Sequence, residues 1–443
     1  ALGFMYYVYS RPLEPTLRFF EQKWGKRLPD LAQANSKVLK AGFNLGDTME
    51  TARNRYQVSK APVQSGVYRK ISGNEAMVYG LVAAAKLANR ELLYSGYPIT
   101  PASPILEGLS QLKNFGVKSV QAEDEIAAMG VALGASFAGD LTVCATSGPG
   151  MCLKSEFIGL ASITELPLII CNVQRGGPST GLPTKTEQSD LLQALFSRHG
   201  DCPIPVLAAH SPSDCFDCAI EAARIALTYM TPVILLSDLY VANGSEPWLI
   251  PNVSDLPVIE NSFASTEEEY VIYRRDPKTL ARSQAIPGQV GLEHRIGGLE
   301  KGEDGGVSYD PDNHEEMSRL RAQKIAGISK SLDPIEIHGD QEGDLLVIGW
   351  GGTYGAISSA VSNLREEGFS ISNIHLRHLN PFPDDLGEIM SRFKKVIVPE
   401  LNLGQLNMLL RAKYLVDVIS YGKLQGKPFK VSELHEKFLE YLR

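Results

Sequence analysis

Residues 96–104 (GYPITPASP), 121–130 (QAEDEIAAMG) and 145–150 (ATSGPG) decide how this chain folds. Each segment follows a short apolar run and precedes a stretch with helical periodicity. This order of strand, loop and helix, met three times, is typical of a parallel α/β sheet. The carboxyl ends of parallel strands lie at one edge of the sheet, where ligands bind. We therefore expect the three loops to line a single site.

The composition excludes several classes of protein. A chain of 443 residues is too long for one ordinary core, and 44% hydrophobic with 21% charged residues is typical of a globular protein. The longest apolar run, residues 166–173, is too short to cross a bilayer, and we expect no signal peptide because Arg11 and Glu14 interrupt the early apolar residues. The formal net charge of −8 gives no support to nucleic-acid binding.

Cysteine usage favours a reducing compartment, and hence the cytoplasm. The six cysteines are too sparse for a disulfide scaffold. Cys215 and Cys218 form a CxxC pair, but the sequence has neither a second pair nor a histidine at metal spacing, so we expect them to be helix residues without a metal. An iron–sulfur cluster is usually held by four thiolates, and the sequence offers no credible set.

Changes of pattern divide the chain into four parts. Residues 1–66 read as helices, over 13–24 and 28–40, joined by polar linkers. Residues 67–250 alternate between strands and helices. Residues 251–340 lose periodicity, apart from a helix expected near 315–325, and are interpreted as a connector. Residues 341–443 form a second, smaller α/β unit. We predict an α/β fold with a larger parallel-sheet domain, covered by helices on both faces, and a smaller α/β domain.

Glu123, Asp124 and Glu125 lie at the expected start of a helix. Acidic residues there can simply complement the helix dipole. The alternative is that one carboxyl faces the apolar residues that follow it, where desolvation favours the protonated form. Such a carboxyl can share a proton with a cofactor nitrogen.

Two glycine-containing loops also have two interpretations each. Residues 146–150 form a small-residue loop at a helix N-terminus, which suits a phosphate, but a tight turn that admits another chain is at least as consistent with them because the Walker lysine is absent. Gly351 and Gly352 after a strand fit a tight turn better than a dinucleotide site.

Arg175 lies directly after a buried strand and beside two glycines. A structural interpretation pairs it with an acid. A functional interpretation is bidentate capture of a substrate carboxylate by the guanidinium. In that case Thr100 and Thr184 can donate hydroxyl hydrogen bonds to the same substrate.

These segments resemble a known family. GYPITP (96–101), EDEIAAMG (123–130), ATSGPG (145–150) and QRGGPSTG (174–181), in that order, resemble the pyrimidine-binding alpha subunit of 2-oxoacid:ferredoxin oxidoreductases, and specifically of the 2-oxoglutarate type. HLNPFP (378–383) and VPELN (398–402) resemble the transketolase C-terminal-type domain that follows in that subunit. Residues 1–66 resemble the tail of the gamma domain that is fused upstream in many members. The resemblance covers nearly the whole chain.

The resemblance implies roles for five residues. Glu125 corresponds to the glutamate that activates thiamine diphosphate. The carbonyl of Pro98 contacts the aminopyrimidine of that cofactor. Thr100 lies beside the substrate, Arg175 binds the 2-oxoacid carboxylate, and Thr184 belongs to the same substrate pocket.

The resemblance also implies a reaction and partners. A 2-oxoacid and coenzyme A give acyl-CoA, CO2 and reduced ferredoxin, or the reverse carboxylation runs. The sequence has no GDG followed by paired asparagines, the motif that holds Mg²⁺ and diphosphate. In the family Mg²⁺ and a [4Fe-4S] cluster belong to the beta subunit. We therefore expect half a site, no metal in this chain, and a dimer of alpha–beta heterodimers without nucleic-acid or membrane partners.

Two other functions remain open at this point. Another thiamine-dependent enzyme, such as a transketolase or acetolactate-synthase relative, would need a diphosphate-binding half of its own. A non-catalytic assembly subunit would have a degenerate pocket, which the joint presence of Glu125, Arg175 and Thr100 disfavours.

Overall fold

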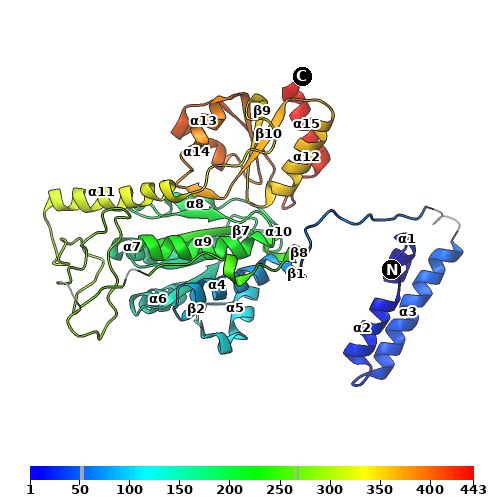
Figure 1. The fold of residues 1–443 in the computed structure, drawn as a ribbon, viewed down its shortest axis with the longest axis horizontal. Helices are drawn as coiled ribbons and strands as arrows, with labels where there is room; N and C mark the ends of the chain where they lie inside the picture. Colours follow the sequence, from blue (N-terminus) through cyan, green and yellow to red (C-terminus); the bar gives the residue numbers. More distant parts are fainter. Residues whose placement is uncertain (50–53, 262, 267–268) are drawn as a thin grey trace. The chain divides into compact units, whose positions relative to one another are not determined.

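The computed structural model describes residues 1–49, 54–261, 263–266 and 269–443, and the chain forms two units, residues 1–66 and 67–443 (Figure 1). The smaller unit contains α1 (Leu2–Val8), α2 (Glu14–Trp24) and α3 (Pro29–Thr48). Gly3 lets α1 approach α3, because a Cβ there would lie 1.9 Å from the carbonyl oxygen of Leu39. Both expected helices are present, and the second extends to Thr48.

The larger unit is built on a seven-stranded sheet with the order β11-β6-β7-β5-β4-β2-β3. All its strands are parallel except β11, which pairs antiparallel with β6. Its strands are β2 (Leu92–Gly96), β3 (Val117–Gln121), β4 (Leu141–Thr146), β5 (Leu168–Gln174), β6 (Val206–Ala208), β7 (Pro232–Asp238) and β11 (His378–Asn380). The central strands β4, β5 and β7 are buried along their whole length, which is why they read as apolar runs.

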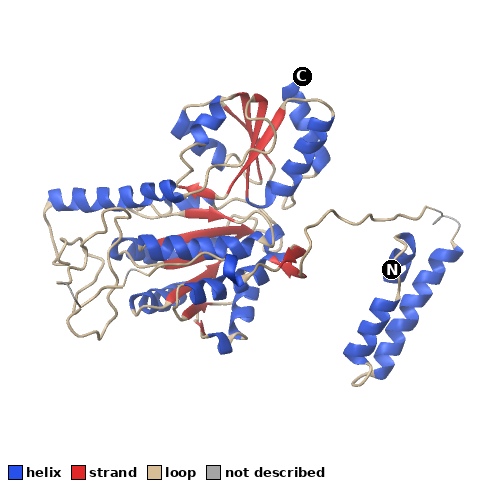
Figure 2. Ribbon diagram, in the orientation of Figure 1, coloured by secondary structure: helices blue, strands red, loops and turns tan. Residues whose placement is uncertain are grey.

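Helices cover both faces of this sheet (Figure 2). Alternate residues of β5 enter different cores: Ile169 packs with the helices of one face, and Ile170 packs with those of the other. The first face is covered by α4 (Gly73–Leu87), α5 (Ser103–Ser110) and α9 (Asp214–Tyr229), and the second by α6 (Glu125–Phe137), α7 (Gly148–Thr164) and α8 (Leu191–Phe196). The Ser72 hydroxyl caps α4 by accepting a hydrogen bond from Glu75 N at 3.4 Å.

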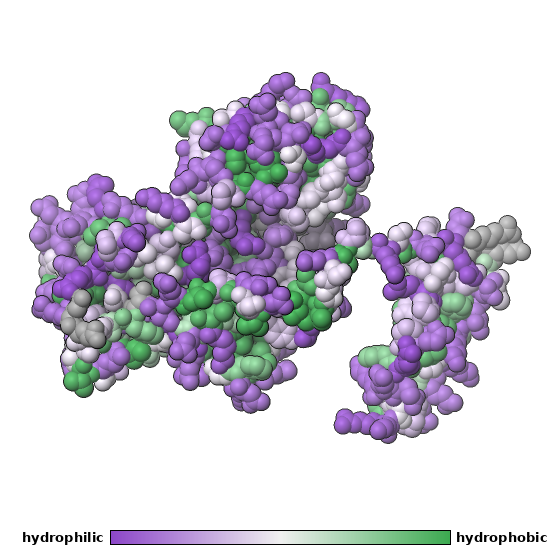
Figure 3. Space-filling model, in the orientation of Figure 1, coloured by the Kyte–Doolittle hydropathy of each residue, from purple (hydrophilic) through white to green (hydrophobic). Residues whose placement is uncertain are grey.

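Short elements complete the edge of this core. Strand β1 (Tyr68–Ser72) pairs antiparallel with β8 (Ser245–Leu249), and α10 (Leu239–Asn243) follows β7. The 3-10 turns η2 (Lys113–Phe115) and η3 (Val253–Asp255) leave apolar side chains at the surface beside α4. Apolar residues gather there on the face drawn in Figure 3. None of the helices in the described residues is long and apolar enough to cross a membrane.

A second, four-stranded parallel sheet has the order β10-β9-β12-β13. Its elements are β9 (Gly343–Trp350), η5 (Gly351–Thr353), α12 (Tyr354–Glu366), β10 (Ile371–Leu376), α13 (Leu386–Ser391), β12 (Phe393–Glu400), α14 (Gln405–Tyr414), β13 (Val418–Gly422) and α15 (Val431–Leu442). The predicted fold class, parallel sheets with helices on their faces, is confirmed.

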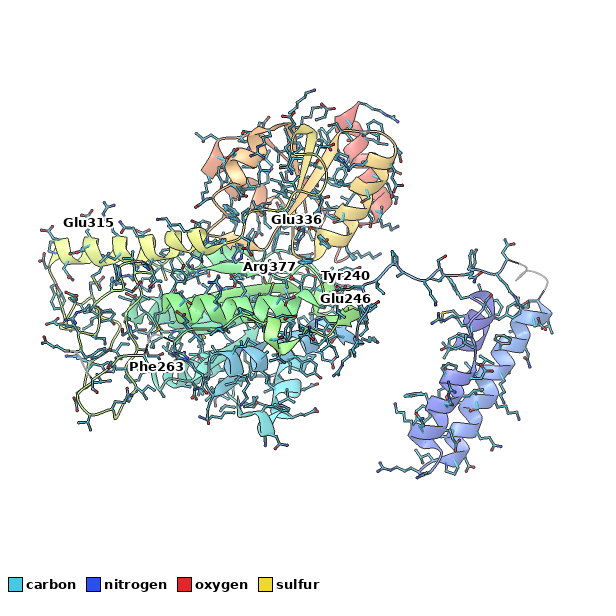
Figure 4. The ribbon with its side chains drawn as sticks, in the orientation of Figure 1. Tyr240, Glu246, Phe263, Glu315, Glu336 and Arg377 are labelled. Carbon is cyan, nitrogen blue, oxygen red and sulfur yellow. The ribbon has the colours of Figure 1, made fainter. Side chains whose placement is uncertain are left out.

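The second sheet is not self-contained, and the sequence did not predict this. Residues 378–380 leave it and form β11, the antiparallel edge strand of the larger sheet. One hydrophobic cluster includes side chains of both sheets, among them Leu236 of β7 and Leu346 of β9. Arg377, labelled in Figure 4, precedes β11 and pairs with Asp214 of α9. The two α/β parts therefore share a core.

Residues 251–340, which connect the two sheets in sequence, are held in place by buried ion pairs. Their regular elements among the described residues are η3, α11 (Pro311–Gly327) and η4 (Ile328–Ser331). Glu165, at the end of α7, accepts hydrogen bonds from Arg275 and Lys324, with N–O distances of 2.5 Å to each. Their side chains are only 1%, 8% and 2% exposed. One buried carboxylate thus holds two separate parts of this polar region, at residues 275 and 324.

We expect Glu165→Ala to lower the free energy of unfolding of the full chain by about 3–5 kcal/mol, because it leaves two buried cations unpaired. Burial alone would raise the pKa of Glu165, but Lys324 and Arg275 lower it to about 2. The stabilisation is therefore complete above pH about 4.5 and is lost as the pH falls toward 2. Denaturant unfolding across this pH range measures both effects.

The matched control is Glu315→Ala, since Glu315 pairs with Arg319 on the surface of α11, with 63% and 70% of their side chains exposed. Exposed pairs contribute little, so this variant should unfold like the wild type. Equal stability of the two variants would contradict the importance of the buried cluster.

Candidate functional site

The three motif loops meet at one glycine. A Cβ built on Gly150 would lie 2.1 Å from Tyr97 Oη, 2.2 Å from Thr146 Oγ1 and 3.1 Å from Glu125 Cγ. These three side chains come from the loops after β2 and β3 and from the end of β4. Only glycine fits there, so the small-residue loop 146–150 allows close approach of neighbouring side chains. The three loops therefore meet at one place, as expected, and a ligand site there stays a prediction.

The structure gives the three neighbouring acids different surroundings. Asp124 caps α6, because its Oδ1 accepts a hydrogen bond from Ala127 N at 2.8 Å. Glu123 is exposed to solvent. Glu125, the first residue of α6, is half-buried and faces Tyr97 and Thr146. The capping interpretation therefore applies to Asp124, and Glu125 is the carboxyl that faces the site.

Tyr97 is a site residue that the sequence reasoning missed. Its hydroxyl lies 2.7 Å from Thr146 Oγ1, and both side chains are buried. Burial raises the pKa of Tyr97, and the nearby Glu125 carboxylate adds to the increase. The available signal was a hydroxyl-bearing aromatic residue directly after a buried strand in GYPITP.

Arg175 and Thr100 are brought together, but through the backbone. The Arg175 Nη1 donates to the carbonyl oxygen of Thr100 at 2.5 Å, whereas the Thr100 side chain is exposed. The Arg175 Nε is buried and has no hydrogen-bond partner among the described residues. An unpaired N–H on a buried guanidinium fits an acceptor such as a carboxylate.

Other polar groups at this edge also lack partners within the described residues. Ser147 Oγ, at the start of α7, and Asn172 Oδ1, in β5, are buried and unpaired. Asn172 Nδ2 donates to Asp190 Oδ2 at 3.0 Å. Burial raises the pKa of Asp190 to about 6, against the opposing effect of that hydrogen bond. The sequence reasoning missed Asp190, which lies in a loop without a motif.

Pro98 and Thr184 are more exposed to solvent than Glu125 and Arg175. Both are exposed. The loop that carries Thr184 is closed by hydrogen bonds from Gly176 N to Lys185 O at 3.0 Å and from Leu182 N to Gly176 O at 2.8 Å. Thr184 therefore lies on a structured loop beside Arg175, and no contact between these two side chains is seen among the described residues.

The smaller α/β part forms hydrogen bonds with the segment that follows this loop, at Gln188. Gln188 Nε2 donates to the carbonyl oxygen of Trp350 at 2.7 Å, and Gln188 Oε1 accepts from Leu401 N at 3.0 Å. Gly352 N donates to Asp238 Oδ2 at 3.0 Å, and a Cβ on Gly352 would lie 2.5 Å from that oxygen. The double glycine therefore makes a tight turn against β7, which favours the turn interpretation over a dinucleotide site.

Metal ligands do not cluster within the part of the chain that the structure describes. The six cysteines are free, and Cys215 and Cys218 are both buried in α9, the helix expected for them.

Comparison with known proteins identifies related chains. Residues 84–306 match the family described as "Pyruvate flavodoxin/ferredoxin oxidoreductase, thiamine diP-bdg", and residues 343–434 match "Pyruvate:ferredoxin oxidoreductase core domain II". The 2-oxoglutarate oxidoreductase subunit KorA of Mycobacterium tuberculosis is 53% identical over 98% of this chain and 66% of its own length. The 2-oxoglutarate synthase subunit KorA of Archaeoglobus fulgidus is 37% identical over 76% of this chain and 88% of its own length.

A solved structure is similar over the whole chain. It is the 2-oxoglutarate:ferredoxin oxidoreductase from Magnetococcus marinus with 2-oxoglutarate, coenzyme A and succinyl-CoA bound. The TM-score is 0.93 with 33% sequence identity, and the match covers 100% of this chain and 77% of that one. The present chain thus spans just under two thirds of the Mycobacterium tuberculosis relative and about three quarters of the Magnetococcus marinus chain.

Proposed function

Because this chain belongs to the pyruvate flavodoxin/ferredoxin oxidoreductase family with a thiamine diphosphate-binding domain, we propose that it is the alpha subunit of a 2-oxoglutarate oxidoreductase. The observation that carries the proposal is the position of Glu125. It is half-buried and borders the point where the three motif loops meet, whereas Glu123 is exposed and Asp124 caps α6. A carboxyl there can hold a proton against a nitrogen of the cofactor.

The residues present fit the cofactor and substrate. Thiamine diphosphate, when bound, supplies the electron sink for decarboxylation. When the cofactor is bound, Glu125 would hold and orient the proton shared with the pyrimidine ring, and the Pro98 carbonyl would accept from the ring's amino group. Gly150 lets Tyr97 and Thr146 come close to Glu125, because any side chain at residue 150 would meet them. Buried Ser147 Oγ, unpaired among the described residues, is a further polar group for a ligand at this edge.

The Arg175 guanidinium is proposed to bind the carboxylate of the substrate. Its Nη1 is fixed on the Thr100 carbonyl, and its unpaired Nε is free to donate to the carboxylate that every 2-oxoacid carries. Thr100 and Thr184 are proposed as further substrate contacts. The names of the relatives point to 2-oxoglutarate as the oxoacid and to coenzyme A as the acyl acceptor.

A beta subunit is proposed to complete the site. It would supply Mg²⁺ binding, the [4Fe-4S] cluster and the route to ferredoxin, and the active assembly would be a dimer of alpha–beta heterodimers in the cytoplasm. Two observations support a covering partner. The sequence lacks a metal–diphosphate motif, and apolar side chains of α6 and α7 remain at the surface, with Ile126 48%, Val131 38% and Leu153 52% exposed.

We assign the parts of the chain accordingly. Residues 67–250 form the pyrimidine-binding domain, residues 251–340 the connector, and residues 341–443 the transketolase C-terminal-type domain. Residues 1–66 form a separate helical arm. The two family matches lie at 84–306 and 343–434, so the first of them extends into the connector.

We expect the chain alone to bind thiamine diphosphate poorly and to be inactive, because the diphosphate and its metal need the partner half. Calorimetric titration with thiamine diphosphate and Mg²⁺, on the chain alone and on the alpha–beta complex, measures the difference. Equally tight binding by the chain alone would reject the half-site model.

A further inference from the structure

One buried residue of the larger α/β part, Gln188, forms hydrogen bonds to the smaller part through both its backbone and its side chain. It has no exposed surface. Besides the two side-chain bonds described above, its backbone N–H donates to Leu401 O at 3.1 Å, and its carbonyl oxygen accepts from Asn402 Nδ2 at 2.8 Å. The partners, Trp350, Leu401 and Asn402, lie at or directly after the ends of β9 and β12. The smaller part therefore fixes this residue in place.

The loop of residues 176–185, here called the substrate loop, begins next to Arg175 and ends close to Gln188. Its two ends are joined by the hydrogen bond from Gly176 N to Lys185 O at 3.0 Å. From Lys185 the chain runs through two buried residues to Gln188. The residue that the smaller part fixes is thus a near neighbour, along the chain, of the bond that closes the substrate loop.

The segment after Gln188 is bonded to the strand end that carries Arg175. Asp190 N donates to Gln174 Oε1 at 3.1 Å. Ser189 Oγ donates to the carbonyl oxygen of Arg175 at 3.5 Å. A displacement of Gln188 would therefore weaken bonds that hold the backbone at Arg175, as well as the closure of the substrate loop.

The smaller α/β part also contacts the substrate loop directly. Gly426 has a φ of +62°, and a Cβ on it would lie 2.7 Å from Lys185 Cβ and 3.5 Å from Leu182 Cδ1. At the start of the loop, a Cβ on Gly176 would lie 3.1 Å from Leu182 Cβ and 3.4 Å from Glu187 Cδ. The substrate loop is therefore packed closely, both on itself and against the smaller part.

We propose that the smaller α/β part holds the substrate loop in its binding conformation before substrate arrives, and that Gln188 is the positioning residue through which it does so. The inference rests on the proposed function, because an oxoacid is the ligand that Arg175 and this loop would bind. A loop that is ordered in advance does not lose conformational entropy when its ligand binds. Without Gln188 that entropy is lost on binding, in the ground state and in the transition state alike. KM should then rise while kcat changes little.

The test uses Gln188→Met in the assembled alpha–beta complex. Methionine keeps most of the buried volume and removes both side-chain hydrogen bonds of the glutamine. KM for 2-oxoglutarate should rise about tenfold, the effect of losing about one net hydrogen bond. The value of kcat should stay within about twofold of wild type. A KM equal to that of wild type would overturn the inference.

Gln284→Met is the matched control. Gln284 is a second buried glutamine, 1% exposed, and its amide also makes two hydrogen bonds. Its Nε2 donates to Ser136 O at 2.7 Å, and its Oε1 accepts from Arg90 Nη1 at 2.8 Å, so the pair of bonds is similar but does not involve the substrate loop. Both variants should unfold at a lower temperature than wild type, whereas Gln284→Met should keep the wild-type KM. An equal rise of KM in both variants would show a general effect of lost stability and overturn the inference.

A measurement on the full chain without substrate separates this inference from the proposed function. Hydrogen–deuterium exchange of peptides covering residues 174–190 reports on the amides of Gly176, Leu182 and Lys185, which are hydrogen-bonded within the loop. These amides should exchange about tenfold faster in Gln188→Met than in wild type and the control, because local opening becomes easier. Unchanged exchange would overturn the inference and leave the proposed function in place. A wild-type complex that turns over no 2-oxoacid would instead overturn the proposed function and, with it, the substrate role of the loop.

Discussion

The Glu125→Ala complex is expected to lose about 10²–10⁴-fold in kcat, the usual contribution of a positioned acid or base. Its free energy of unfolding should stay within about 1 kcal/mol of wild type, because Asp124 and not Glu125 caps α6. Steady-state kinetics with 2-oxoglutarate and thermal unfolding of the same preparation measure the two quantities separately.

Glu123→Ala is the matched control for this result. Glu123 is also an acid of the same loop, two residues away, but it is exposed to solvent. The control should keep most of the activity. An essential Glu123 together with a dispensable Glu125 would mean that the wrong carboxyl has been placed in the site.

Arg175→Lys should lose about 2–5 kcal/mol of transition-state binding for every 2-oxoacid tested, the range for removing one side of a buried charged pair. This is roughly 30-fold or more in kcat/KM. A guanidinium can rest on the Thr100 carbonyl through Nη1 and still donate through Nε. The single nitrogen of lysine cannot do both. Measurements with pyruvate, 2-oxobutyrate and 2-oxoglutarate test whether the loss is general.

Two comparisons make the Arg175 result specific. Arg198→Lys changes a partly buried arginine whose guanidinium bonds to carbonyl groups around the end of α8, so kcat/KM should be unaffected. Thr184→Val, on the exposed limb of the loop, should change the preference among oxoacids and not the capture of all of them. Normal kinetics of Arg175→Lys with all three substrates would leave Arg175 a purely structural role.

The sequence predicted the part of the site that short segments encode. Three loops at strand ends had to share an edge, and Glu125 was selected from its motif. Lys154, whose Nζ lies 4.6 Å from the centroid of the Tyr97 ring, could not be found in the same way. Lysine is rarely buried, and its burial here depends on packing between α7, β4 and Tyr97. Such contacts join residues far apart in sequence, which periodicity does not report.

The edge strand β11 is a part of the fold that could not be predicted from the sequence, because it also depends on contacts between distant residues. The residues His378, Leu379 and Asn380 are too few and too polar to predict a strand. They form one because β6 offers an unpaired edge, and Asn380 Nδ2 also donates to the carbonyl oxygen of Ile204 at 2.7 Å. The division of the chain into four parts therefore reflected local sequence pattern. Tertiary pairing, in contrast, decided which strands share a sheet.

Strand β11 follows β10 of the smaller sheet in sequence but completes the larger sheet, and this limits where the chain can be truncated. A fragment that ends before residue 341 would leave β6 with open N–H and C=O groups and would uncover the apolar cluster shared by the two sheets. During synthesis the same edge stays open until the ribosome has released residues 378–380. The larger sheet is therefore complete only after those residues have emerged, and its exposed edge is the place where a truncated or slowly made chain would aggregate.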